Sequence, residues 1–423
     1  MFKNLLALLR TPDLRKKVFI ILLLLVIFRI MATIPLPNID REQLQVFLSS
    51  NQIFGLFNVF TGGAFKNISI ALLGVGPFIT ASIIMQLLTM VFPALKEMLN
   101  EGTDKERAKF MQYSRLLTIP LAALQGFGFL NLLSRQGVIV FASPLDLIRD
   151  IVIVTTASVF LMWIGELITE QKLGNGISLI IFTGIVIDFP REIMQTIIST
   201  DPTRIPNMIA FFAISLLMIV GVVFISRGER RIPVSYAKQV RGTKIYGGAS
   251  TYLPLKINQA GVIPIIFALS ILMFPQMISQ FLATSQSPFM LKMALFLQGF
   301  NQQSLIYLAC YFGLVVLFTF FYTTITFNPE SIAENLQKRG GFVPGYRPGK
   351  TTSQYLVNTS HKVTLFGAIF LGMIAILPII MQQTTGVTTF AIGGTSILIM
   401  VSVAIETMDT IEAQLIMREY EIS

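Results

Sequence analysis

Side chains that commonly carry chemistry are rare in this chain of 423 residues. It contains one cysteine, Cys310, and one histidine, His361. A zinc site draws its ligands mainly from Cys and His, and thiol catalysis pairs a reactive cysteine with a base. One residue of each kind supplies neither arrangement, and a lone cysteine has no partner within the chain. We therefore expect no metal site, no intrachain disulfide and no thiol catalysis.

The phosphate-binding signature GxxxxGK[ST], whose glycine-rich loop holds nucleotide phosphates, does not occur in the sequence. We therefore expect no cofactor and no enzymatic activity. Any work that the protein performs then requires an energy source outside the chain.

Few ionisable residues interrupt the apolar runs of the sequence. Arg29 lies towards the outer end of the first run, and Glu166 lies near the inner end of the fourth. Glu406 and Asp409 follow the last run. Ion-coupled transporters usually carry such groups near the middle of the membrane, so the sequence disfavours coupled transport.

Two pairs of isoleucines have helical spacing. Ile79 and Ile83 lie in the second apolar run, and Ile181 and Ile185 lie in the fifth. A spacing of four places each pair on one helix face. Such a face is either ordinary packing and lipid-facing surface, or part of a hydrophobic constriction that excludes water and ions.

Residues 53–67 form an apolar segment that Gly62 and Gly63 interrupt. The segment is too short to cross a bilayer, so it either lies at the membrane interface or re-enters the membrane. Non-helical backbone at membrane depth is tolerated only inside protein or beside a water-filled cavity. Re-entry would therefore imply a cavity at this place.

Two segments between apolar runs are basic and longer than a connection requires. Residues 227–256 carry seven Lys/Arg and one acid, Glu229. Alternating runs near 232–236 and 244–246 predict a protruding hairpin there. The second segment is 328–361. These loops either orient the chain and contact lipid headgroups, or bind RNA phosphates or an acidic protein partner.

The elements that must position these residues are membrane-spanning helices. The chain is 53% hydrophobic and 13% charged, whereas about a quarter of an ordinary soluble domain is charged. A crossing takes roughly 20 apolar residues, because backbone groups in hydrocarbon must be bonded within their own helix. The sequence therefore predicts an all-α polytopic membrane protein with ten transmembrane helices. The predicted spans are 18–34, 70–92, 116–133, 147–168, 177–194, 208–225, 260–281, 305–327, 363–381 and 390–405.

The first and fifth of these spans are the least regular. Basic residues precede 18–34, as in a secretory signal, but the run is long and is followed by Pro35 and Pro37 rather than small residues. We interpret it as a retained span. Asp188 and Pro190 interrupt the second half of the fifth span, which is therefore the weakest prediction.

The distribution of basic residues predicts the orientation. The side that holds the N-terminus receives 24 Lys/Arg and the opposite side receives seven, with Arg29 inside the first span. Cytoplasmic loops retain positive charge, so both termini are predicted to be cytoplasmic. Ten spans divide into five and five, residues 1–195 and 196–423, and the second half must then be inverted. Inverted halves commonly enclose a central pathway or pore.

Five motifs occur along the whole chain in a recognisable order. They are GPFITASIIMQLL at 76–88, GNGIS at 174–178, LPLKINQAGVIP at 253–264, GYRPG at 345–349 and GGTS at 393–396. Together they resemble the SecY family, the central subunits of the bacterial protein-conducting channel. Met85, where the family usually has a third isoleucine, is a small departure.

The resemblance implies a role for each feature noted above. Residues 57–70 correspond to a plug that seals the external funnel, and a ring of aliphatic residues lines the pore. Spans two and seven form a lateral gate, and the two basic loops dock partners. The implied pore ring is Ile79, Ile83, Ile181, Ile185, Ile266 and Ile399; the plug is Phe57, Val59, Phe60, Gly62, Gly63 and Phe65; the gate is Gln86 and Asn258; the docking residues are Arg241, Lys244, Arg339 and Arg347.

The resemblance also implies function, partners and location. The expected function is translocation of unfolded secretory polypeptides across the bacterial plasma membrane, with lateral release of membrane segments into lipid. The implied partners are the SecE and SecG subunits, the SecA motor, the ribosome, preproteins bearing signal sequences, and lipids including anionic ones. Two other hypotheses remain: a secondary transporter for a small solute, and a membrane anchor with RNA-binding loops.

Overall fold

A computed structural model of the chain describes residues 11–40, 43–44, 61–65, 67–100, 102–199, 205–236, 239–241, 244–246, 250–282, 287–299, 304–385 and 389–422. Helices dominate this part of the chain. They are α2 (Pro12–Thr33), α5 (Gly76–Val91), α6 (Pro93–Asn100), α7 (Asp104–Arg135), α8 (Pro144–Glu170), α9 (Gly176–Ser199), α10 (Ile205–Arg227), α11 (Ile263–Leu282), α12 (Pro288–Gln298), α13 (Leu305–Thr326), α14 (Pro329–Lys338), α15 (Lys350–Thr385) and α16 (Thr389–Ile422).

Each of the ten predicted spans overlaps one of these helices. Four helical stretches in the described residues are long and apolar enough to cross a membrane: Asp104–Arg135, Pro144–Glu170, Leu305–Lys338 and Lys350–Met381. The bent pair of α5 and α6 makes a fifth. Other apolar helices are shorter, so the number ten stays a prediction. The sequence prediction missed α12, an apolar helix between α11 and α13.

The second span begins later than predicted. We expected a helix from residue 70, but α5 starts at Gly76 and the residues before it form turns. Gly74 has φ +54°, and a Cβ atom there would lie 2.7 Å from Cα of Thr61. Only glycine accepts this conformation and this close approach without strain.

The same span ends in a sharp bend. Phe92 has an extended backbone, as expected before Pro93, whose ring disfavours the helical conformation of the preceding residue. The helix axis therefore turns by 117° between α5 and α6.

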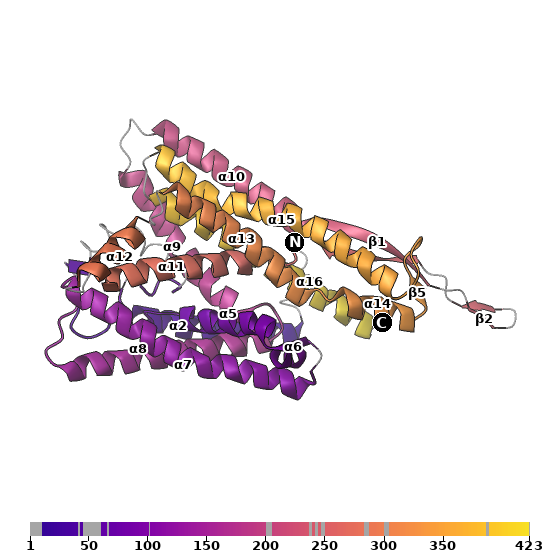
Figure 1. The fold of residues 1–423 in the computed structure, drawn as a ribbon, viewed down its shortest axis with the longest axis horizontal. Helices are drawn as coiled ribbons and strands as arrows, with labels where there is room; N and C mark the ends of the chain where they lie inside the picture. Colours follow the sequence, from indigo (N-terminus) through magenta and orange to yellow (C-terminus); the bar gives the residue numbers. More distant parts are fainter. Residues whose placement is uncertain are drawn as a thin grey trace.

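The helices of the two halves pack in two groups that meet through a few contacts. In Figure 1, α2, α7 and α8 lie below α11, α13 and α15. Neighbours in each group are in contact, including α7 with α8 and α13 with α15. The groups meet where α11 packs against α5 and where α16 packs against α9.

The first basic loop folds as the predicted hairpin. Strand β1 (Glu229–Tyr236) pairs antiparallel with β4 (Ser250–Lys256), from Glu229 opposite Lys256 to Ser235 opposite Ser250. At its tip, β2 (Gln239–Arg241) pairs with β3 (Lys244–Tyr246). The hairpin projects beyond the helices at the right of Figure 1.

The second basic segment, 328–361, is less of a loop than predicted. It contains α14 and the first turns of α15, and its strand β5 (Gly341–Phe342) pairs with the end of β1. A buried cluster of Ile232, Val234, Leu255, Val343 and Leu356 joins the two segments. The two basic segments therefore form a single structural unit.

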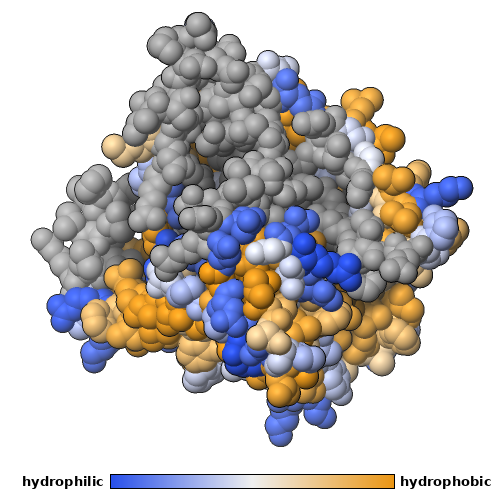
Figure 2. Space-filling view, turned by 90° about the vertical axis from the view of Figure 1, so that its left-hand side faces the viewer, coloured by the Kyte–Doolittle hydropathy of each residue, from blue (hydrophilic) through white to orange (hydrophobic). Residues whose placement is uncertain are grey.

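The flanks of the molecule expose large apolar side chains. Phe224 on α10 is 75% exposed and Phe296 on α12 is 81% exposed. In the end-on view of Figure 2, hydrophobic patches lie to either side of a hydrophilic patch near the middle, and further hydrophilic residues lie at the margins. Apolar flanks are expected where helices face lipid rather than water.

Candidate functional site

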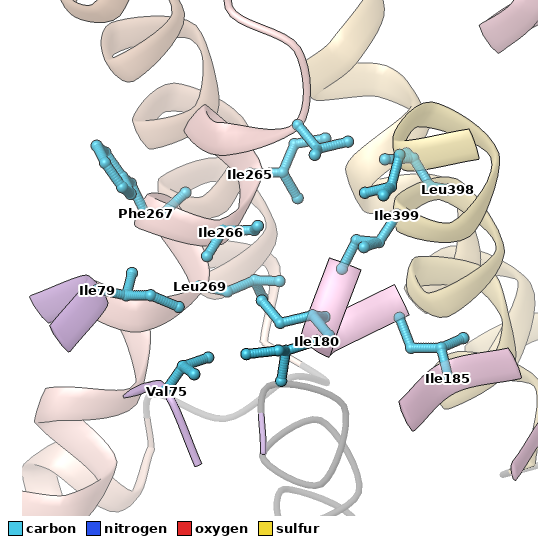
Figure 3. Packing of buried hydrophobic residues seen from close by; sticks show 14 of the residues in the cluster. Val75, Ile79, Ile180, Ile185, Ile265, Ile266, Phe267, Leu269, Leu398 and Ile399 are labelled. Atoms are coloured by element: carbon cyan, nitrogen blue, oxygen red, sulfur yellow. The ribbon is translucent and has the colours of Figure 1, made fainter. Parts of the chain in front are cut away.

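The six isoleucines singled out from the sequence belong to one buried cluster. Their exposed fractions range from 0% for Ile181 and Ile399 to 6% for Ile79. They come from α5, α9, α11 and α16, and thus from both halves of the chain. Figure 3 shows Ile79 and Ile266 on one side and Ile399 on the other, with their side chains directed toward a common centre.

Sequence reasoning missed other members of this cluster. Val75, Ile180, Leu269 and Leu398 are buried in it and are seen beside the isoleucines in Figure 3. Leu269 follows Ile266 by three residues on the same helix, a spacing that keeps both on one face. This spacing in the sequence could have indicated that Leu269 lies beside Ile266 in the cluster. The side chains of the six isoleucines and of these four residues are hydrocarbon, so they can close around an apolar space without forming a hydrogen bond.

The described part of the predicted plug packs against two buried clusters. Ala64 belongs to the isoleucine cluster, as does Ala71 just after the segment. Phe65 and Ile68 belong to a second cluster, which includes residues of α7. Phe65 is fully buried and meets Phe129 of α7 edge to face, with ring centres 6.0 Å apart. Phe57, Val59 and Phe60 lie outside the described residues. Residues 61–65 and 67–75 have a non-helical backbone, and all of them except exposed Asn67 and half-buried Ile70 are buried, so this part of the segment enters the protein rather than lying on its surface.

Gly62 and Gly63 form a tight turn at the start of this segment. Their φ angles are +64° and +85°, which favour glycine. The carbonyl oxygen of Gly62 accepts a hydrogen bond of 3.4 Å from Nη1 of Arg29 on α2. Nη2 of Arg29 in turn lies 3.7 Å from Oδ1 of Asp188 on α9. The sequence prediction noted both charged residues but did not pair them.

The structure gives Gln86 and Asn258 different surroundings. Gln86 lies on α5, where its Nε2 donates a hydrogen bond of 3.3 Å to Oγ of Ser82. Asn258 lies just before α11 and donates to the carbonyl of Gly261 at 3.2 Å. It lines a pocket of about 240 Å³ together with Ser402 and other residues, and Gln86 is not among them. No hydrogen bond therefore joins Gln86 to Asn258.

One polar atom of each residue is left without a partner among the described residues. Oε1 of Gln86 and Oδ1 of Asn258 are both buried and accept no hydrogen bond there. A buried polar atom without a partner costs free energy, so each is a weak point where the packing can open at low cost. Among the residues that the structure describes, no three His, Cys, Asp or Glu side chains lie close enough together to hold a metal ion.

Comparison with known proteins connects this geometry to a family. The sequence profile of the SecY family matches residues 69–408. The protein translocase subunit SecY of Mycobacterium bovis is 41% identical over 436 residues, an alignment that covers 98% of this chain and 97% of that protein. The chain belongs to the SecY family. Its function is that of a channel for protein translocation, and it is a multi-pass membrane protein.

Solved structures agree on the fold at lower sequence identity. The solved structure of a protein-conducting channel superposes on this chain with a TM-score of 0.65 at 19% sequence identity. The superposition covers 94% of this chain and 91% of the channel chain. A SecY structure whose plug domain stabilises the closed state of the channel has a TM-score of 0.60 at 19% identity, covering 92% and 90%. Canine Sec61 in a ribosome–channel complex has a TM-score of 0.61 at 18% identity, covering 94% and 91%.

In this SecY family member the predicted docking residues lie at the hairpin end of the molecule. Arg241 and Lys244 face each other across the β2–β3 pair, and their side chains are outside the described residues. Arg339 is exposed at the end of α14. Arg347 is also exposed, and its carbonyl accepts a hydrogen bond of 2.8 Å from Oγ1 of Thr352.

An aromatic pair supports the turn that carries Arg347. The ring of Tyr346 stacks on Tyr355 of α15, with ring centres 4.1 Å apart. Gly345 and Gly349, with φ +88° and +95°, close the turn on either side. Arg347 is therefore presented to solvent on a supported loop.

Proposed function

We propose that the buried isoleucine cluster is the constriction of the channel and that the segment around 61–70 is its plug. The convergence of six isoleucines from four helices carries this proposal. A hydrocarbon ring holds no polypeptide by specific bonds, so it accepts any sequence, and it loses its water and blocks ions when empty. The SecY structure with a plug domain that stabilises the closed channel supports the second assignment.

The gate for lateral release lies between α5 and α11 in this proposal. These two helices meet where the N-terminal half, residues 1–195, contacts the C-terminal half, 196–423. Gln86 and Asn258 are the proposed polar residues of the gate. Each carries an unpartnered buried atom within the described part of the chain, which supports an interface that opens readily. Apolar segments would then pass sideways into lipid, with each Leu or Ile contributing a few tenths of a kcal/mol.

The hairpin and the Arg347 turn are the proposed docking surface for the SecA motor and the ribosome. Canine Sec61 was solved with a ribosome, which supports the second partner. Basic protrusions suit RNA phosphates and acidic protein surfaces. SecE and SecG are the proposed partner subunits, preproteins the substrates, and anionic lipids the contacts of the basic side. The proposed location is the bacterial plasma membrane with both termini in the cytoplasm.

Site-specific photocrosslinking tests the constriction. A photoreactive residue replaces Ile83, and in a second variant it replaces Phe224, which is 75% exposed on α10. A secretory chain stalled during export should crosslink at position 83 and not at 224. Crosslinking only at 224, or equally at both positions, would contradict the proposed path.

A further inference from the structure

Arg29 and Asp188 are opposite charges on two apolar helices. Their side chains are 23% and 11% exposed, so both are largely removed from water. Charged residues within spans are costly and usually serve a function. The N–O distance of 3.7 Å is longer than a tight ion pair, which leaves the guanidinium free to serve a second acceptor.

That second acceptor is the backbone of the Gly62–Gly63 turn. Nη1 of Arg29 donates to the carbonyl of Gly62 at 3.4 Å. A Cβ atom on Gly63 would lie 2.7 Å from Oδ2 of Asp188 and 3.1 Å from Nη1 of Arg29. The turn therefore sits directly on the ion pair, and only a residue without a side chain fits there.

The helices around the turn also fit its backbone closely. A Cβ atom on Gly62 would lie 2.6 Å from the ring of Phe28 on α2. Gly184, one helical turn before Asp188 on α9, approaches the backbone of Gly62 so closely that a Cβ atom would collide with it. Glycines at 62, 63 and 184 thus let the turn settle between α2 and α9.

We propose that Arg29 and Asp188 form a latch that positions the plug in the closed channel. This inference rests on the proposed plug function of the segment around 61–70. Asp188 holds the guanidinium in place, and the guanidinium holds the Gly62 carbonyl. The link to the plug itself is a hydrogen bond to a carbonyl, which water can replace when the plug leaves.

The location of the latch has a mechanical consequence. Both α2 and α9 belong to the N-terminal half, and they are in contact with each other. Separation of α5 from α11 at the proposed lateral gate therefore does not by itself stretch the latch. The latch keeps the plug in place while the gate opens, and an entering polypeptide must displace it.

Two measurements on the complete channel test the latch. The first is the resting ion leak of reconstituted vesicles. The second is the rate at which a membrane-impermeant maleimide labels Ser69→Cys from outside, in a Cys310→Ser background; Ser69 is fully buried within the segment. Arg29→Gln and Asp188→Asn should each raise the leak and speed labelling about tenfold, because the first removes the charged donor to Gly62 and the second removes the ion pair that positions this donor.

Control variants separate the latch from general damage to the fold. Arg29→Lys keeps a charged donor and should restore most of the seal. The double variant Arg29→Gln/Asp188→Asn should label no faster than the more affected single variant, because the two residues act as a unit. Asp146→Asn, which removes one charge from the 3.1 Å Arg149–Asp146 pair at the start of α8, should behave like the parent protein.

Deletion of residues 61–70 distinguishes a failure of the latch proposal from a failure of the plug proposal on which it rests. If the deletion raises the leak while Arg29→Gln and Asp188→Asn leave leak and labelling unchanged, the latch is wrong and the plug stands. If the deletion leaves the leak unchanged, the plug assignment itself is wrong, and the latch falls with it.

Discussion

At the scale of single residues, the proposed constriction depends on the absence of polar atoms. Ile266 is 5% exposed and lies among other aliphatic side chains of the cluster. A ring of this kind blocks ions only while it stays free of water. A substitution that places one amide group in this ring is therefore expected to change the stability of the closed channel and its selectivity for signal sequences.

We expect Ile266→Asn to admit water into the constriction. The buried amide lacks a partner in a hydrocarbon cluster, which costs about 1–3 kcal/mol of closed-state stability. Resting ion leak should rise, and secretory proteins with defective signal sequences should be exported. Ile266→Leu, which keeps the hydrocarbon surface, is the matched control. Equal leak and equal signal selectivity in the two variants would contradict the assignment.

Arg347 is the corresponding test of the docking surface. Replacing it with glutamate reverses the charge on a solvent-exposed turn, so the fold should persist while the contact with a motor is lost. SecA-driven export into vesicles should stop, although the variant channel assembles in normal amounts. Arg347→Lys should retain part of the activity. Normal export by the glutamate variant would contradict the assignment of Arg347 to the docking surface.

At the scale of elements, glycines set how closely the helices approach. Gly176 opens α9 and lies against the carbonyl oxygen of Gly165 on α8, so a Cβ atom there would collide with it. Gly184 has the same relation to the plug turn. The helix α9 therefore contacts α8 at Gly176 and the proposed plug at Gly184, and it also contributes isoleucines to the buried cluster.

We expect Gly176→Ala to push α8 and α9 apart. Such overpacking typically costs about 1–3 kcal/mol, which thermal unfolding of the purified channel in detergent should detect as a lower midpoint. Gly313→Ala on α13 is the matched control, because a Cβ atom there meets nothing within 4 Å. Its midpoint should equal or exceed that of the parent, since alanine favours the helix. Equal loss in both variants would contradict the packing argument.

At the scale of the whole molecule, two groups of helices share one large apolar cluster. Contacts that join the groups, including α5 with α11, α7 with α11 and α9 with α16, bring residues that are far apart in sequence to one place. A channel of this kind serves many substrates, whereas a secondary transporter serves few. Loss of this protein should therefore affect many secretory proteins rather than the uptake of one solute.

Rapid depletion of the protein in cells tests this difference. A translocation channel is the common exit for secretory proteins, so uncleaved precursors of many of them should accumulate within minutes to hours. Restored expression of the wild-type chain should clear the precursors. Normal precursor processing after depletion would contradict a role of this chain in general secretion.

Much of this architecture could be predicted from local sequence. Helices were predicted at each apolar run because membrane hydrocarbon requires backbone bonds within the segment, a constraint that a single sequence displays directly. The β1–β4 hairpin was predicted from alternation in residues 227–256. Roles for individual residues came from five family motifs rather than from composition or spacing.

Tertiary structure decided the features that depend on contacts between distant segments. Arg29 and Asp188 looked like an isolated charge and an interruption of a weak span, because their partnership exists only where α2, α9 and the Gly62–Gly63 turn meet. The late start of α5 likewise follows from the approach of Gly74 to Thr61. Periodicity reports which face of a helix is apolar, but it carries no information about which other helix or turn that face meets.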